Sequence, residues 1–218
     1  EHASRLAVDT ACQSFARGWA HYGAQELTDR PHEFSQGIAK VVGQRLALEG
    51  EFSPSTNRGG TTFSGLLIAG RRAGICHVGD SRVMLIRDDK LIQITDDHTL
   101  ATILIRLGEL TPEQAEKNDL SQRTISRFLS TSAEVETGKI DNIGREVRAE
   151  LGEESCDETG FLVRRGDLFI LTSDGAHGEA DAATIKRMAE ENPTNPQGLC
   201  DALVENALDR LGRDNSTA

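Results

Sequence analysis

After residue 60 the sequence changes from helical periodicity to a series of short β-type segments, and this series restricts the fold more than any other feature. Four runs rich in aliphatic and β-branched residues follow one another, at Thr61–Ala69, Arg72–Val78, Arg82–Arg87 and Leu91–Thr95. The connections are only a few residues long, and Asp88 to Lys90 predicts a tight hairpin turn. Strands joined this closely pair antiparallel, because a parallel pair needs a crossover of about a dozen residues or more. The sequence therefore predicts an antiparallel meander.

Helical patterns lie on both sides of this meander. Apolar side chains recur at helical spacing in residues 2–22, 33–48, 181–191 and 197–211. A further helix begins at Thr111, where the sequence TPEQ has the pattern of a capping box. Later strands are expected at Arg145–Leu151, Gly160–Arg164 and Leu168–Thr172, whereas residues 119–144 are polar and favour neither state. This order predicts the α+β class in one domain, residues 1–218, with helices covering the sheet faces.

Composition excludes several functional classes. The formal net charge is 24 − 35 = −11 and the cations do not cluster, so nucleic acid is a poor partner. No apolar run approaches the roughly 18 residues of a membrane span, and no secretory leader is visible. The four cysteines lie far apart without the spacing of a zinc site. We therefore expect a reduced, cytoplasmic protein without a membrane partner.

Three acidic residues stand where an apolar element ends. They are Asp80 in Gly-Asp-Ser-Arg, Asp174 in Ser-Asp-Gly and Asp214 in Arg-Asp-Asn. Each alone is more often a turn residue than a ligand, because Asp and Asn near glycine commonly form Asx turns. If the three converged, their mutual repulsion would require a cation, and ligand sets made only of oxygen favour Mg²⁺ or Mn²⁺. Metal-assisted phosphohydrolysis is the functional alternative to turn chemistry.

Read together, these motifs resemble the metal-dependent protein phosphatases, the type-2C serine/threonine phosphatases, in their bacterial form. The similarity runs through Gly59–Leu100, with the elements GTT, GDSR and TDDH, and through Arg106–Ala115, which resembles the mobile flap of the family. It continues in Gly166–Gly175 and in Asp214–Thr217. Residues Glu1–Ala11 resemble the helix that follows the first glycine-rich loop of the family.

The resemblance implies a four-layer α-β-β-α sandwich of two antiparallel sheets flanked by helices, with the metals between the sheets. Asp174 and Asp214 match metal-binding aspartates of the family. Asp80 matches the aspartate that helps to hold a third metal in bacterial-type members. Two ions, or three, are therefore expected, Mn²⁺ or Mg²⁺. The catalytic and substrate-binding residues stay unassigned.

The chain departs from the family pattern at both ends. It begins after the first glycine-rich loop, so it lacks the first strands, the first metal-binding acids, the phosphate-binding arginine and the histidine assigned to the leaving group. It also ends at Ala218, before the last strand. We expect these segments to exist in the natural polypeptide. Residues 119–160 depart most from the family and are candidates for specificity.

The resemblance implies a metal-dependent phosphatase acting on phosphoserine and phosphothreonine in proteins that a serine/threonine kinase phosphorylates. The alternative is a non-catalytic, phosphatase-like binding or regulatory module, which the missing first loop suggests. His177 is the histidine that could be considered as a general acid near pH 7, whereas His98 looks like a structural position of the family. We expect His177 to be a surface or packing residue, and His98 to be hydrogen-bonded rather than catalytic.

Overall fold

The computed structural model describes residues 2–52, 59–130, 141, 143, 145–152, 155–210 and 216–218. The chain divides into two compact units. The first consists of Glu1–Asp80 and Asp97–Arg164, and the second of Ser81–Asp96 and Arg165–Ala218. Within the described ranges, no helix has both the length and the hydropathy that crossing a bilayer requires.

The first unit contains a four-stranded antiparallel sheet, in the order β2-β3-β8-β7, and a small two-stranded pairing of β1 with β6. Its strands are β1 (Gly60–Thr61), β2 (Phe63–Ala69), β3 (Arg72–Val78), β6 (Leu129–Ser130), β7 (Cys156–Asp157) and β8 (Gly160–Leu162). Its helices are α1 (His2–Asp29), α2 (Pro31–Phe52), α3 (Leu100–Arg106), α4 (Pro112–Glu116), α5 (Asp119–Arg123) and α6 (Arg145–Leu151).

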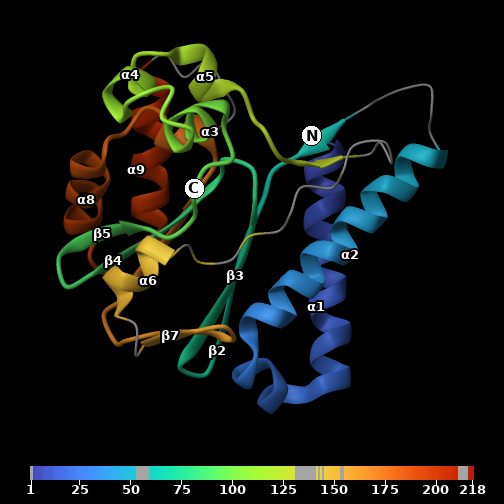
Figure 1. Cartoon of the computed structure of the whole chain (residues 1–218). Helices are drawn as coiled ribbons and strands as arrows, with labels where there is room; N and C mark the ends of the chain where they lie inside the picture. Colours follow the sequence, from blue (N-terminus) through green and yellow to red (C-terminus); the bar gives the residue numbers. More distant parts are fainter. Residues whose placement is uncertain are drawn as a thin grey trace. The chain divides into compact units, whose positions relative to one another are not determined.

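Helices α1 and α2 lie side by side, and α2 packs on β2 and β3 (Figure 1). Non-helical angles at Gly23 interrupt α1. The first turn of α2 approaches β3 so closely that a Cβ atom at Gly74 would lie 2.1 Å from the carbonyl carbon of Pro31. Side chains from both helices, β3 and β6 form one core cluster, namely Ala7, Val42, Leu46, Val78 and Leu129. Burial of each of the larger ones contributes about 1.5–3 kcal/mol.

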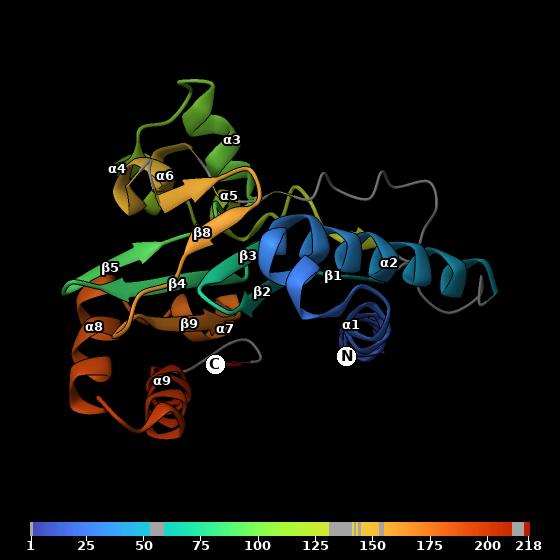
Figure 2. The ribbon, with the colours of Figure 1, turned by 90° about the horizontal axis from the view of Figure 1, so that it is seen from below.

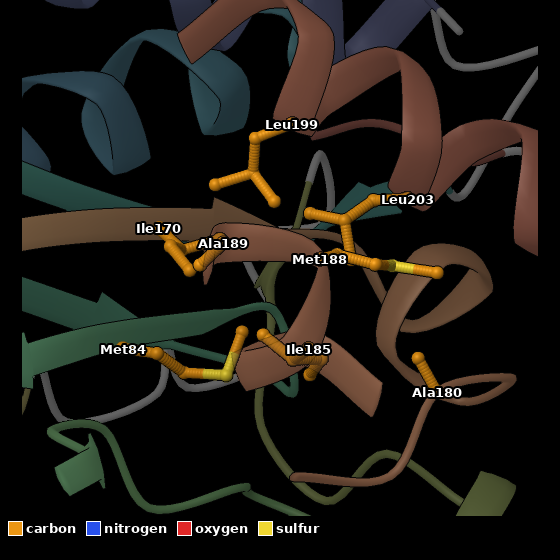
Figure 3. Packing of buried hydrophobic residues seen from close by; sticks show 8 residues of the cluster. All are labelled: Met84, Ile170, Ala180, Ile185, Met188, Ala189, Leu199 and Leu203. Atoms are coloured by element: carbon orange, nitrogen blue, oxygen red, sulfur yellow. The ribbon is translucent and has the colours of Figure 1, made fainter. Parts of the chain in front are cut away.

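The second unit is a three-stranded antiparallel sheet in the order β5-β4-β9, together with three helices (Figure 2). Its elements are β4 (Arg82–Arg87), β5 (Lys90–Gln93), β9 (Leu168–Thr172), α7 (Asp174–His177), α8 (Ala182–Glu191) and α9 (Pro196–Asp209). Figure 3 shows its core, in which side chains of α8 and α9 meet those of β4 and β9. The cluster consists of Met84, Ile170, Ala180, Ile185, Met188, Ala189, Leu199 and Leu203.

The predicted hairpin is present, because Arg87 pairs with Lys90 across the turn between β4 and β5. Asp88 and Asp89 have φ angles of 49° and 62°, so both central residues of this two-residue turn are left-handed. This is the pattern of a type I′ turn, whose twist matches that of the paired strands. The capping box at Thr111 also forms, with both of its reciprocal hydrogen bonds.

The prediction of a strand at Arg145–Leu151 was wrong, because these residues form the helix α6. Val147 and Leu151 are both buried, and their spacing of four residues suits one face of a helix rather than one face of a strand. Arg, Glu, Ala and Leu in this segment also have high helix propensity. The short helix α7, directly after β9, was not expected from the sequence.

Candidate metal centre

The turn after β3 carries Asp80, the first of the predicted ligands. β3 is buried along most of its length and ends at Val78. Gly79 then has a φ of 113°, and a Cβ atom there would lie 2.4 Å from the side chain of Thr62, so this position requires glycine. Asp80 follows at once, with only 6% of its surface exposed. The sharp turn thus ends the strand and leaves a carboxylate almost fully buried at that point.

His98 fixes this turn through both its backbone and its ring. Its backbone N–H donates to the carbonyl oxygen of Gly79 over 2.8 Å. In return, the Gly79 N–H donates to Nδ1 of the His98 ring over 3.0 Å. Because Nδ1 accepts a hydrogen bond, the neutral ring carries its proton on Nε2. The expectation that His98 is hydrogen-bonded is confirmed.

Asp141 lies on the other side of the His98 ring. Its Oδ2 is 3.0 Å from Nε2 of His98 and 3.0 Å from Nη1 of Arg127. Burial alone would raise the pKa of the Asp141 carboxyl, but the hydrogen bond with His98 and the charge of Arg127 outweigh burial and lower the pKa. The backbone of Asp141 pairs with that of His77 through two hydrogen bonds of 2.9 Å. An ionised Asp141 therefore orients His98 from a fixed position.

Asp174, the second predicted ligand, is the first residue of α7 in the second unit and is exposed. The turn that carries it is held by His177, whose Nδ1 is 2.9 Å from Oγ1 of Thr172 at the end of β9. Both His177 and Thr172 are buried. This position agrees with the expectation of a packing histidine, because the ring supports the turn from inside the unit.

Asp214, the third predicted ligand, lies outside the described residues. The residues shortly after it do lie against the turn of Asp174. Thr217 N–H donates to Oγ of Ser173 over 3.0 Å, and Ser173 N–H donates to the carbonyl oxygen of Thr217 over 3.1 Å. Oγ of Ser216 donates to the carbonyl oxygen of Gly175 over 2.9 Å. Two motifs that are distant in sequence therefore meet in the second unit.

The donor chemistry of the predicted ligands fits a hard divalent cation, because all three are carboxylates. Asp80 and Asp174 belong to different units. Among the residues that the structure describes, no group of three or more His, Cys, Asp or Glu side chains is gathered closely enough to hold an ion. The assignment of the three aspartates as ligands stays a prediction.

Sequence reasoning missed Arg127 and Asp141. Both come from residues 119–160, where the resemblance is weakest, and Asp141 lies 43 residues from His98. No periodicity or short motif marks such a contact. Of the residues in this contact, the sequence motifs pointed to His98, which belongs to the TDDH element.

Comparison with known proteins shows which protein family has a similar sequence. Residues 23–103 match the family model described as Protein phosphatase 2C, a range that includes Asp80 and His98. The serine/threonine protein phosphatase PstP of Mycobacterium tuberculosis is 34% identical over 172 residues. This alignment covers 79% of the chain but only 29% of PstP, so the chain spans less than a third of that relative.

Solved structures give a longer match. A crystal structure of the Mycobacterium tuberculosis phosphatase PstP/Ppp has a TM-score of 0.70 and 28% identity, and covers 97% of this chain and 80% of that one. A structure of the PstP catalytic domain in complex with two manganese ions has a TM-score of 0.67 and 26% identity, with coverages of 96% and 78%. These matches confirm the predicted α+β fold class.

Proposed function

Because the chain belongs to the protein phosphatase 2C family, we propose that the protein containing it is a metal-dependent phosphatase that hydrolyses phosphoserine and phosphothreonine in other proteins. The observation that carries this proposal is the match to bacterial serine/threonine phosphatases, over 79% of the chain in sequence and 97% of the chain in fold. Its substrates on this proposal are proteins phosphorylated by a serine/threonine kinase. The four free cysteines support a cytoplasmic location.

We assign Asp174, Asp214 and Asp80 as ligands of two or three Mn²⁺ or Mg²⁺ ions. Manganese is suggested by the related PstP structure, which contains two manganese ions. The assignment of these three residues as ligands is supported by their chemistry, since all three are carboxylates. Divalent cations bound there would neutralise phosphate charge and lower the pKa of a water that attacks phosphorus without a covalent enzyme intermediate. The buried carboxylate of Asp80 would contribute charge where solvent is largely excluded.

The role of Asp174 is tested by Asp174→Asn in the full-length protein, with phosphate release from a phosphothreonine peptide as the assay. Loss of one anionic ligand should reduce Mn²⁺-dependent turnover by at least about 100-fold, since direct ligands matter at least as much as their supporting residues. Asp201→Asn is the matched control, because Asp201 is also an exposed carboxylate of the second unit and accepts a hydrogen bond from Gln197 within α9.

Equal turnover by the Asp174→Asn and Asp201→Asn variants would contradict the ligand assignment. An inactive wild-type protein that is folded and saturated with Mn²⁺ would instead favour the non-catalytic binding module.

A further inference from the structure

His98 lies where three segments of the first unit meet. Ser126 N–H donates to the carbonyl oxygen of His98 over 2.7 Å, and Leu100 N–H donates to that of Thr124 over 2.8 Å. These two hydrogen bonds join the beginning and the end of the segment that contains α3, α4 and α5. His98 is 4% exposed, so its ring is held within the protein on all sides.

The ring connects Asp141 to the turn of Asp80. On one side, Nε2–H faces a carboxylate that Arg127 also contacts. On the other, Nδ1 accepts from the N–H of Gly79, the residue directly before Asp80. The carbonyl oxygen of Gly79, which accepts from the backbone N–H of His98 over 2.8 Å, belongs to the planar peptide group that leads into Asp80. His98 therefore holds Gly79 at both its N–H and its C=O, and this restricts where the Asp80 carboxylate can lie.

We propose that His98 is a positioning residue, which holds the Gly79–Asp80 turn so that the Asp80 carboxylate is oriented for a divalent cation. The proposal rests on the proposed metal-binding function of Asp80 and adds two residues to it, His98 and the Asp141 that orients its ring. Supporting residues of this kind typically change metal affinity by 10–100-fold when they are replaced.

The alternative is that His98 only stabilises the fold, and the chain offers a matched control for it. His32 is a second buried histidine of the first unit, 1% exposed, and its Nδ1 accepts from the N–H of Ile75 over 2.9 Å. The two histidines therefore make the same kind of bond to a backbone amide. Only the amide held by His98 stands next to a predicted ligand.

Two substitutions separate the hydrogen bond of the His98 ring to Gly79 from its hydrogen bond to Asp141. In His98→Asn, the amide oxygen stands as many bonds from Cα as Nδ1 does, so it can still accept from Gly79. In His98→Gln, the amide nitrogen stands as many bonds from Cα as Nε2 does, so it can reach Asp141 while the acceptor for Gly79 is lost.

The experiment is a calorimetric titration of the metal-free full-length protein with Mn²⁺. We expect His98→Gln to weaken the Asp80-dependent binding by about tenfold, and His98→Asn to weaken it by less than about threefold. His32→Gln should leave the affinity unchanged although it loses an equivalent hydrogen bond. In an Asp80→Asn background, the effect of His98→Gln should disappear, since the two changes act on one ligand.

Equal affinities of the His98→Gln and His32→Gln variants, or an effect that persists without Asp80, would overturn the positioning role. This failure is distinct from failure of the proposed function, which would appear as absence of phosphate release by the wild-type protein. A second measurement needs no variant. Mn²⁺ should slow hydrogen exchange of the Gly79 amide and leave that of the Ile75 amide unchanged; equal responses of the two amides would contradict the proposal.

Discussion

Removal of one partner from the buried ion pair of Arg87 and Asp167 should strongly destabilise the second unit. The two residues face each other across β4 and β9, next to the paired residues Ile86 and Leu168. Arg87 donates from Nε to Oδ1 over 2.8 Å and from Nη2 to Oδ2 over 2.6 Å. Only 6% and 3% of the two side chains are exposed.

The magnitude follows from this burial. Asp167→Ala leaves the guanidinium of Arg87 without this carboxylate in a nearly dry environment, and breaking a buried pair in this way typically costs about 3–5 kcal/mol. Replacing both residues, as in Arg87→Met with Asp167→Leu, removes both charges and should cost less than about 1 kcal/mol, because such exchanges are often neutral or stabilising. The double variant should therefore be more stable than the single one.

Urea denaturation followed by circular dichroism gives the comparison. With a slope of about 2–3 kcal/mol/M, the single variant should shift the midpoint of unfolding by at least about 1 M. A shift below about 0.3 M would refute the reasoning. So would a double variant less stable than Asp167→Ala, because the cost would then come from packing and not from an uncompensated charge.

Two further predictions concern stability. Asp89→Gly should stabilise the turn between β4 and β5 by about 0.5–1 kcal/mol, since Asp89 has a φ of 62° that glycine adopts without strain; a lower melting temperature of the variant would contradict this. Asp157 bonds Arg72 over 2.6 Å, and although burial raises its pKa, the hydrogen bonds with Thr159 and Arg72 lower that pKa to about 2. The contribution of Asp157 to the free energy of unfolding should be present above its unfolded pKa of about 3.8 and lost as pH falls toward 2. Because the Asp157 side chain is exposed, this contribution should not exceed about 1 kcal/mol. Equal pH dependence of wild-type and Asp157→Asn unfolding would rule this out.

Local signals in the sequence predicted the elements that depend on neighbouring residues. The hairpin at Asp88 and Asp89 and the capping box at Thr111 are each formed by residues at most three positions apart, so their chemistry is visible in a short window. The segment Arg145–Leu151 failed because seven residues with few apolar side chains give little periodicity. Burial of Val147 and Leu151 decides its state, and burial depends on distant parts of the chain.

The candidate site shows the same limit. The three aspartates were proposed as ligands because each ends an apolar element within a recognisable motif, and the turns of Asp80 and Asp174 do lie directly after β3 and β9. The support of the Asp80 turn was not predictable. Asp141 reaches His98 across 43 residues and pairs with His77 on β3, and only the folded sheet brings these segments together.

The most direct test of the central claim is phosphate release from a phosphothreonine peptide by the full-length wild-type protein, titrated with Mn²⁺ and then with a chelator. The account predicts no release without metal, a saturable rise with Mn²⁺, and complete loss when the chelator is added. Release that is unchanged by the chelator, or a folded, Mn²⁺-saturated protein that releases no phosphate, would contradict it.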